Sequence, residues 1–240
     1  MAAHQRTRES YGVKRLHSEL VDQGVQITAY RVRVLRKKLN LRCKQKRKFK
    51  VTTDSKHHLP FAPNILKREF AVSAPGKAWV SDITYLPTDE GWLYLAGIKD
   101  LFNSELIGYA MNERMTTELV IQALFRATDR KLPESGLILH SDRGSQYCAH
   151  DYQDILKQLG IVSSMSGKGD CWDNAPMESF WGTLKNELVH HRKFKTRLQA
   201  KQEITEYIEI FYNRQRKQEK LGYLSPAEFT QQYYANLLAA

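Results

Sequence analysis

Residues 136–142 read GLILHSD, and this short stretch sets the architecture. The run from Gly136 to His140 is apolar without alternation, which is typical of a strand that is buried on both faces. Asp142 follows this run almost directly. In a mixed α/β sheet, functional sites gather at the carboxyl ends of such strands. We therefore predict a buried strand here, with a functional carboxylate just beyond its end.

Upstream of that strand, the sequence predicts three more strands. Residues 79–86, 92–101 and 106–111 are rich in β-branched and aromatic residues, as strands are. Turn residues at Glu90-Gly91 and Asn103-Ser104 separate them. Strands joined by short turns pair with their neighbours in the chain, so we expect an antiparallel meander.

The rest of this region alternates helical and strand patterns. Spacing and punctuation predict helices over 117–131, 149–159 and 197–215, a helix that begins near Pro176, and a strand over 161–164. A loop rich in Gly, Asp and Asn fills residues 166–176. In that loop Trp172, like His140 upstream, is interpreted as a packing or loop-shaping residue. The order of elements predicts an α/β fold, a mixed sheet with helices on both sides.

The positive charge lies at the N-terminus. Residues 1–50 hold 15 Lys and Arg against three acids, a net charge of +12, whereas residues 51–240 carry a net charge of −1. A local field of this kind attracts a polyanion such as nucleic acid. A solvated basic tail is the alternative, but helical periodicity in this segment favours a folded DNA-binding element.

That periodicity has the form of a helix-turn-helix. Helical spacing covers residues 9–21 and 29–39, and Gln23-Gly24 interrupts it. Thr28 is expected to cap the second helix, and its Val32 and Leu35 to face the first. A helix, a short turn with Gly and a basic second helix form the helix-turn-helix pattern, although other helical hairpins share it.

Three carboxylates are the candidate catalytic and metal-ligating residues. Asp82 lies in the middle of a predicted strand, where Asp is depleted. Asp142 follows the buried strand, and Glu178 falls in the first turn of the helix that Pro176 opens. Carboxylates from separate elements can converge on Mg²⁺, which prefers oxygen ligands. Two such ions about 4 Å apart support phosphoryl transfer.

Other acids remain open as alternatives. Any of these Asp residues is also interpretable as a solvated or capping residue. Asp170 and Asp173 lie in the loop that leads to Glu178, as caps or alternative ligands. Glu187 is nine residues beyond Glu178, hence two and a half turns further along and on the opposite side of the helix, so we prefer Glu178.

The basic residues expected to contact DNA fall into three groups. Lys185 lies seven residues after Glu178, on the same helix face. The second helix of the hairpin and the charge run after it supply the others. These are Arg31, Arg33, Arg36, Lys37, Lys38, Lys44, Lys46, Arg47 and Lys48.

These motifs together resemble a known family. WVSDITYL with Asp82, LILHSDRGSQY with Asp142 and DNAPMESFWGTLKNE with Glu178 resemble the DDE signature of retroviral integrases and insertion-sequence transposases, with 35 residues between the last two acids. These strings and the tail YNRQRKQEKLGYLSPAEF are similar to the second-frame (OrfB) product of the IS-three family. The segment YGVKRLHSELVDQGVQITAYRVRVLRKKLNL resembles the helix-turn-helix that precedes its core. The resemblance runs from about Ser10 to Tyr234.

The resemblance implies an RNase H-like fold, a mixed five-stranded sheet with flanking helices, after a small all-α segment. It implies a transposase that cleaves and transfers DNA strands with two Mg²⁺ ions held by Asp82, Asp142 and Glu178, and Mn²⁺ is expected to substitute. We expect a helix-turn-helix segment over residues 1–45, a basic linker over 46–73 that tracks a phosphate backbone, and the catalytic core over 74–236. The chain begins nine residues before the helix-turn-helix region, where family members usually have more sequence, so truncation of that segment is expected.

The expected partners follow from the same family. They are duplex DNA, both the element's terminal inverted repeats and the target, further copies of the chain in a homo-oligomer, and the upstream-frame (OrfA) product, often as a frameshift fusion. No apolar run approaches the ~20 residues of a membrane helix, and Cys43, Cys148 and Cys171 are scattered. We therefore expect no membrane span, and a bacterial cytoplasmic protein at the nucleoid.

Two other functions remain. The chain could be a catalytically inactive DNA-binding regulator, or a domesticated copy that competes for element ends. It could also be an RNase H-type nuclease. Three mutually repelling carboxylates favour the transposase over a mere binder, and the basic helices favour duplex DNA over an RNA–DNA hybrid.

Overall fold

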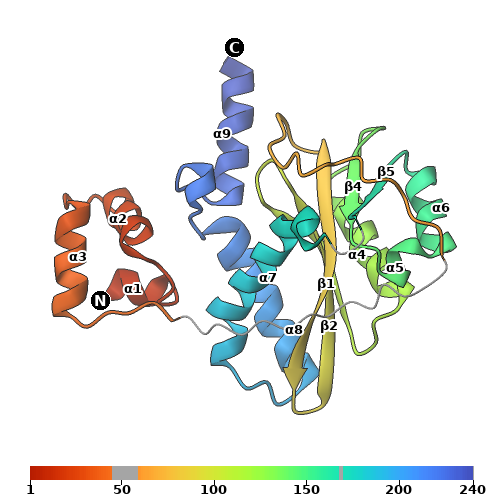
Figure 1. The fold of residues 1–240 in the computed structure, drawn as a ribbon. Coiled ribbons are helices and arrows are strands. Elements are labelled where there is room, and N and C mark those ends of the chain that lie inside the picture. The colour runs from red at the N-terminus through yellow and green to blue at the C-terminus, as the bar shows by residue number, and fades with distance from the viewer. Residues whose placement is uncertain (45–58, 168–169, 240) are drawn as a thin grey trace. The chain divides into compact units, whose positions relative to one another are not determined.

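The computed structural model describes residues 1–44, 59–167 and 170–239 (Figure 1). They divide into two compact units, which the chain enters more than once. The core unit takes residues 59–167, 170–183 and 193–205, and the helical unit takes residues 1–44, 184–192 and 206–239. No helix in the described ranges has the length and apolarity to cross a membrane.

The core unit is built on one mixed sheet of five strands, in the order β3-β2-β1-β4-β5. Antiparallel pairs join β1 to β2 and β2 to β3, whereas β4 runs parallel to β1, and β5 to β4. The strands are β1 (Ala78–Thr88), β2 (Gly91–Asp100), β3 (Leu106–Asn112), β4 (Ile138–Ser141) and β5 (Val162–Met165). The expected meander and the expected mixed sheet are both confirmed.

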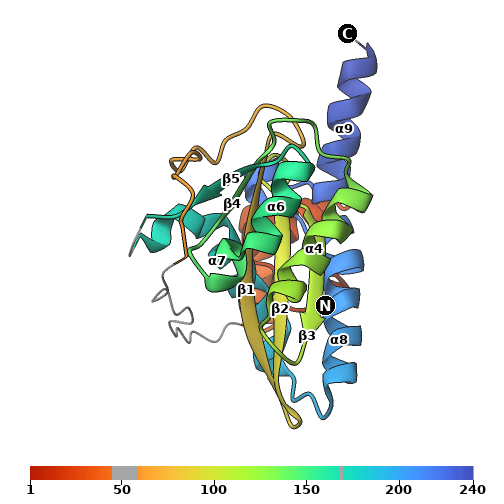
Figure 2. The same cartoon turned by 90° about the vertical axis from the view of Figure 1, so that its right-hand side faces the viewer.

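Helices cover both faces of this sheet (Figures 1 and 2). One face carries α4 (Thr117–Arg130), α5 (Ser145–Cys148) and α6 (His150–Gln158), and the other carries α7 (Ala175–Glu187) and α8 (Arg197–Glu206). The short turns η1 (Cys171–Asn174) and η2 (Val189–His191) flank α7. The sequence did not predict α5, because four residues are too few to show a helical period.

The close packing of α4 on the sheet depends on a glycine. A Cβ built on Gly108 in β3 would lie 2.6 Å from the Cβ of Ala127 in α4. The small residues Ala123 and Ala127, both fully buried, therefore let α4 approach the strand backbone. This close approach completes the apolar core that lies on this face of the sheet.

The residues before β1 are attached to the edge of the sheet. The backbone N–H groups of Ile65 and Leu66 donate to Ser164 Oγ in β5, at 2.9 and 3.1 Å. The N–H of Met165 donates to the carbonyl of Pro63. The second half of the predicted linker thus covers an edge strand, which protects the unpaired strand groups. The first half, with Lys46, Arg47 and Lys48, lies outside the described residues.

The helical unit contains the predicted helix-turn-helix elements. Its elements are α1 (Ala2–Arg6), α2 (Val13–Asp22), α3 (Ala29–Lys38), η3 (Tyr207–Tyr212), η4 (Glu219–Leu221) and α9 (Pro226–Ala239). The expected cap is present, since Arg31 N–H donates to Thr28 Oγ1 at 3.2 Å. Val32 is buried and Leu35 half-buried, because α3 packs on α2 through this face.

The long helix predicted over residues 197–215 changes from an α-helix to a π-helix midway. It begins as α8 and continues as a π-helix, η3. Four large side chains of η3, Tyr207, Ile208, Phe211 and Tyr212, are buried. A π-turn is wider than an α-turn, and here the Tyr207 hydroxyl donates to Glu187 Oε2 at 2.7 Å.

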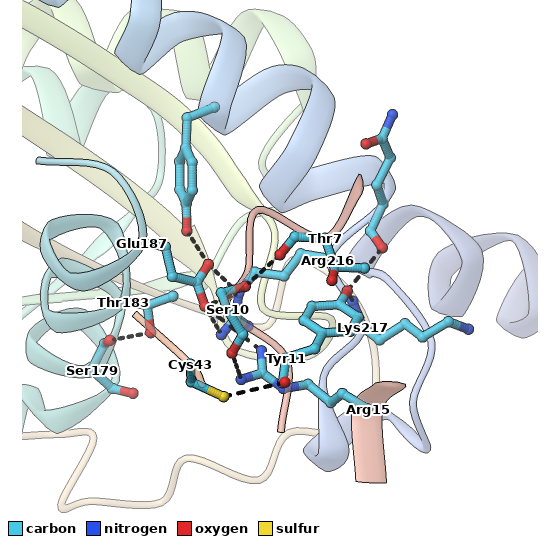
Figure 3. A network of polar contacts seen from close by, with 12 residues as sticks. Thr7, Ser10, Tyr11, Arg15, Cys43, Ser179, Thr183, Glu187, Arg216 and Lys217 are labelled. Carbon is cyan, nitrogen blue, oxygen red and sulfur yellow. Dashed lines mark hydrogen bonds and ion pairs between the residues drawn. The ribbon is translucent and has the colours of Figure 1, made fainter. Parts of the chain in front are cut away.

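Glu187 is the centre of the polar network in this unit (Figure 3). It receives two hydrogen bonds of 2.9 Å from the guanidinium of Arg216, and Arg15 Nη1 lies 3.7 Å from Glu187 Oε1. Burial alone raises the pKa of Glu187, but the charge and hydrogen bonds of Arg216 outweigh it and hold the pKa below its ordinary value. Glu187 therefore joins α2, α7 and the C-terminal segment, and is not a candidate metal ligand.

Replacement of Glu187 by Gln should destabilise the protein by about 3 kcal/mol or more, because it leaves the buried guanidinium of Arg216 without its counter-charge. Urea unfolding monitored by circular dichroism measures this loss. The matched control is Glu219→Gln, which breaks the exposed Lys14–Glu219 pair and should leave the midpoint close to wild type. Equal midpoints for the two variants would contradict the central role of Glu187.

Candidate active site

Asp82 lies in the middle of the sheet, on β1. Its cross-strand partner on β2 is Gly97. The indole Nε1–H of Trp181, on α7, donates to Asp82 Oδ2 at 3.0 Å. The side chain keeps part of its surface accessible, so a ligand can reach it.

The strand register brings Asp142 beside Asp82. Val80 of β1 pairs with His140 of β4 in a parallel ladder. Asp82 on β1 and Asp142, in the loop directly after β4, each follow this pair by two residues. Neighbouring strands are about 4.8 Å apart, so the register brings the two aspartates close to each other. Gly144 N–H donates to Asp142 Oδ1 at 2.9 Å and turns the chain away after the strand.

Glu178 reaches the same region from α7. Two side chains fix the start of this helix against the sheet: Asn174 Nδ2 donates to the carbonyl of Ser81, and Lys99 Nζ donates to the carbonyl of Pro176. The Trp181 hydrogen bond to Asp82 adds a third attachment. Glu178 itself is exposed.

The charges of Asp142 and Glu178 both act on Asp82. The pKa of Asp82 is raised well above its ordinary value, first by burial and then by the charges of Asp142 and, more weakly, Glu178. Hydrogen bonds from Ile83 N–H and Trp181 oppose this rise without cancelling it. Burial also raises the pKa of Glu178. A bound cation would relieve this repulsion, and hard oxygen donors suit Mg²⁺.

The site fits a divalent cation in its donor set and only partly in its geometry. Asp82 and Asp142 form the pair on the sheet. Across the part of the chain that the structure describes, no three His, Cys, Asp or Glu side chains converge closely enough to hold one ion. Glu178 is the exposed member, and its long side chain can rotate toward the pair.

The other candidate acids have structural roles. Asp173 is buried and accepts hydrogen bonds from Arg68 Nε, Asn64 Nδ2 and Gly167 N–H, at 2.5, 2.9 and 2.8 Å. Asp170 pairs with Arg68 at 3.4 Å. Both residues thus hold the loop before α7 against the segment before β1. Trp172 is 68% exposed, so of its two expected roles, packing or loop-shaping, the packing role is wrong.

His140 is a buried, neutral residue beneath the site. Ser164 Oγ accepts the N–H groups of Ile65 and Leu66, so its own hydrogen points to His140 Nδ1, at 2.8 Å. The ring proton then lies on Nε2 and points to Ser166 Oγ, at 3.2 Å. Burial lowers the pKa of His140 to about 4. These hydrogen bonds of Ser164, His140 and Ser166 hold the end of β4, and Asp142 begins the loop that follows it.

The neutral state of His140 predicts a pH dependence of stability. The unfolded His binds a proton below pH ~6.5 and the folded one only below about 4, so stability should fall as the pH drops through this window, by up to about 3 kcal/mol. His140→Asn should remove this part of the slope. Urea unfolding of both proteins from pH 7 to pH 4 measures the difference curve, and parallel curves would contradict the assignment.

The structure also places the predicted DNA-contact residues. Arg31, Arg33, Lys37 and Lys38 are exposed on α3. Arg36 is half-buried instead, and its Nη2 lies 3.3 Å from Cys43 Sγ. Lys44 pairs with Glu9 at 2.6 Å, and Lys185 is half-buried on α7. Arg36 is thus turned toward the protein, whereas the other four basic residues predicted on α3 face solvent.

The sequence did not single out the residues that position the carboxylates, namely Trp181, Lys99, Asn174 and Gly97. Trp181 did offer a signal, since it lies three residues after Glu178 and shares its helix face. Lys99 and Gly97 gave none, because only the pairing of β2 with β1 shows that they lie beside the site.

The order of the five strands and the helices on both faces of the sheet define an integrase core of the RNase H-like class. The fold is similar to a chain of the simian T-cell lymphotropic virus intasome in complex with PP2A regulatory subunit B56 gamma, with a TM-score of 0.56 and 15% identity over 95% of this chain and 72% of that one. It is also similar to the catalytic core domain of BIV integrase, with a TM-score of 0.52 and 17% identity over 68% of this chain and 99% of that one.

Sequence comparison identifies the family. Integrase core domains match residues 72–171 and 178–234, and an HTH-like domain matches residues 1–49. The chain is 58% identical to the insertion element IS600 uncharacterized 31 kDa protein of Shigella sonnei, over 97% of this chain and 85% of that protein. It is 42% identical to transposase InsF for insertion sequence IS3A of Escherichia coli, over 95% and 80%. The chain belongs to the IS3-family insertion-sequence transposases.

Proposed function

We propose that this transposase cleaves and joins DNA strands at Asp82, Asp142 and Glu178, which hold two divalent cations. One observation carries the proposal: the parallel register Val80–His140 brings Asp82 and Asp142 together at the sheet, where α7 adds Glu178. Mg²⁺ is the natural ion for this donor set and Mn²⁺ its substitute. The HTLV-2 integrase catalytic core, 14% identical with a TM-score of 0.51, is described in complex with magnesium.

The reaction is in-line displacement at phosphorus. In cleavage, water attacks a phosphodiester, the bond from phosphorus to the 3′-oxygen breaks, and a 3′-hydroxyl and a 5′-phosphate result. In strand transfer, that 3′-hydroxyl attacks a target phosphodiester and one ester bond replaces another. The cations, when bound, stabilise the charge on the attacking and leaving oxygens. The three carboxylates would hold these ions. Trp181 holds the Asp82 carboxylate, while Lys99 and Asn174 hold the start of α7 against the sheet.

DNA binding is assigned to the helical unit. Its exposed basic residues on α3 and its HTH-like domain support contact with duplex DNA at the terminal inverted repeats, and Lys185 on α7 would contact DNA beside the acids. A homo-oligomer is the expected working form, because two element ends are joined together. The upstream-frame product would act as partner or fusion.

A catalytically inactive regulator is the second candidate, and the basic α3 is the observation in its favour. The clustered carboxylates weigh against it. Burial, and then the charges of Asp142 and Glu178, raise the pKa of Asp82, which costs folding free energy that a DNA-binding protein has no need to accept. An RNase H-type nuclease would share the core but has no use for a helix-turn-helix.

Asp142→Asn and Glu178→Gln should each abolish strand joining on a pre-branched DNA that mimics an integration intermediate, with Mg²⁺ or Mn²⁺ present, because each removes a charged ligand. DNA affinity, measured by fluorescence anisotropy, should stay near wild type. Asp154→Asn, an exposed acid on α6 paired with Lys157, is the matched control and should react normally. Activity in the two site variants would refute the proposed site, and an inactive wild type that binds DNA tightly would favour the regulator.

Arg33→Ala and Lys37→Ala should each weaken DNA binding and reduce the slope of log affinity against log salt by about one unit. Each residue is exposed on α3 and would neutralise one phosphate. Arg36→Ala is the internal comparison, since Arg36 contacts Cys43. Arg36→Ala should lower the melting temperature and leave the slope of log affinity against log salt close to wild type. Unchanged slopes for Arg33→Ala and Lys37→Ala would exclude α3 as a phosphate-binding helix.

A further inference from the structure

One aromatic side chain joins the helix of Glu178 to the strand of Asp82. Trp181 is only 5% exposed, and its indole Nε1–H donates to Asp82 Oδ2 at 3.0 Å. It lies three residues after Glu178 on α7, so the two side chains extend from the same helix face. The first turns of α7 therefore present a carboxylate and a hydrogen-bond donor to the same region of β1.

The sheet leaves space for this indole at Gly97. Gly97 is the cross-strand partner of Asp82 on β2. A Cβ built on Gly97 would lie 2.8 Å from Trp181 Cη2, and real Cβ atoms essentially never come so close. Any larger residue at position 97 would therefore push the ring out of its place. The ring fits beside Asp82 because its partner in the ladder has no side chain.

We propose that Trp181 is a positioning residue, which holds the Asp82 carboxylate in the orientation that receives a divalent cation, and that Gly97 makes this contact possible. The inference rests on the proposed function, because it takes Asp82 as a ligand. The residue touches neither DNA nor the reacting phosphate in this role. It acts through Asp82 alone.

The chemistry of the indole suits this role. Its N–H is a donor only and carries no charge, so it orients a carboxylate without neutralising it. A Lys or Arg in its place would compete with the cation for the same negative charge. An ionised carboxylate has about four lone-pair sites, so one hydrogen bond to Oδ2 leaves others for a metal. Outer-shell donors of this kind typically change metal affinity by about 10–100-fold.

Two independent substitutions in the full-length chain test the proposal. Trp181→Phe keeps an aromatic ring, a smaller one, and removes the donor, whereas Gly97→Ala keeps the donor and displaces the indole. Mn²⁺ binding without DNA, followed by electron paramagnetic resonance, should weaken about 10-fold in each variant. Because both substitutions remove the same hydrogen bond, the double variant should bind Mn²⁺ no more weakly than the worse single variant.

The control is a matched indole–carboxylate pair elsewhere in the core unit. Trp79 is fully buried, and its Nε1–H donates to Asp100 Oδ2 at 3.3 Å. Trp79→Phe removes an equivalent donor from a buried Asp outside the proposed site. It should lower the unfolding midpoint, as Trp181→Phe does, and leave Mn²⁺ affinity unchanged. A purely structural Trp181 would give the same result as Trp79.

The outcomes separate this inference from the function on which it rests. If Asp82→Asn abolishes Mn²⁺ binding while Trp181→Phe and Gly97→Ala bind it within about twofold of wild type, Trp181 is packing only and the inference is wrong. If Asp82→Asn also binds Mn²⁺ as wild type does, the proposed metal site itself is wrong. In strand joining, saturating Mn²⁺ should restore most of the rate of Trp181→Phe and none of the rate of Asp82→Asn.

Discussion

The burial of the Asp82 carboxylate on the central strand, beside the charge of Asp142, is the constraint around which the core is organised. Asp82 and Asp142 follow the Val80–His140 pair at equivalent positions, and their proximity contributes to the raised pKa of Asp82. Such an arrangement costs free energy in a folded protein unless the surrounding groups are fixed. The sheet register brings the two aspartates close to each other. Hydrogen bonds from Ile83 and Trp181 to Asp82, and from Gly144 to Asp142, stabilise the two carboxylates.

Helix α7 brings together features that lie far apart in the sequence. Its first turns carry Glu178 and Trp181 and belong to the core unit. Its last turn carries Glu187, whose buried pair with Arg216 belongs to the helical unit. Two acids on one helix thus have opposite electrostatic surroundings: Glu178 has a raised pKa, and Glu187 a lowered one. The difference arises because Arg216 and Arg15 surround only the second.

Much of the fold followed from local patterns. The meander, the buried strand after Gly136 and the Thr28 cap were all predicted, because period, turn residues and capping chemistry act over a few residues. The short helix α5, the π-helix after Glu206 and the exposure of Trp172 were not. Helix α5 is too short to show a helical period. The other two features depend on contacts with distant parts of the chain: Tyr207 donates a hydrogen bond to Glu187, and Asp173, next to Trp172, accepts the hydrogen bonds that hold the loop.

The sequence by itself determined the three acids, their order, and the separation of basic helices from a mixed core, because residue chemistry and spacing are properties of the chain. Only the tertiary structure decided the electrostatic surroundings of each acid. Arginines bind Asp173 and Glu187, whereas Asp82 is buried beside the charge of Asp142. It also decided that Gly97 must be small and that Trp181 meets Asp82. The reason is that strand pairing and helix packing join residues about 100 positions apart, and no local pattern encodes such a contact.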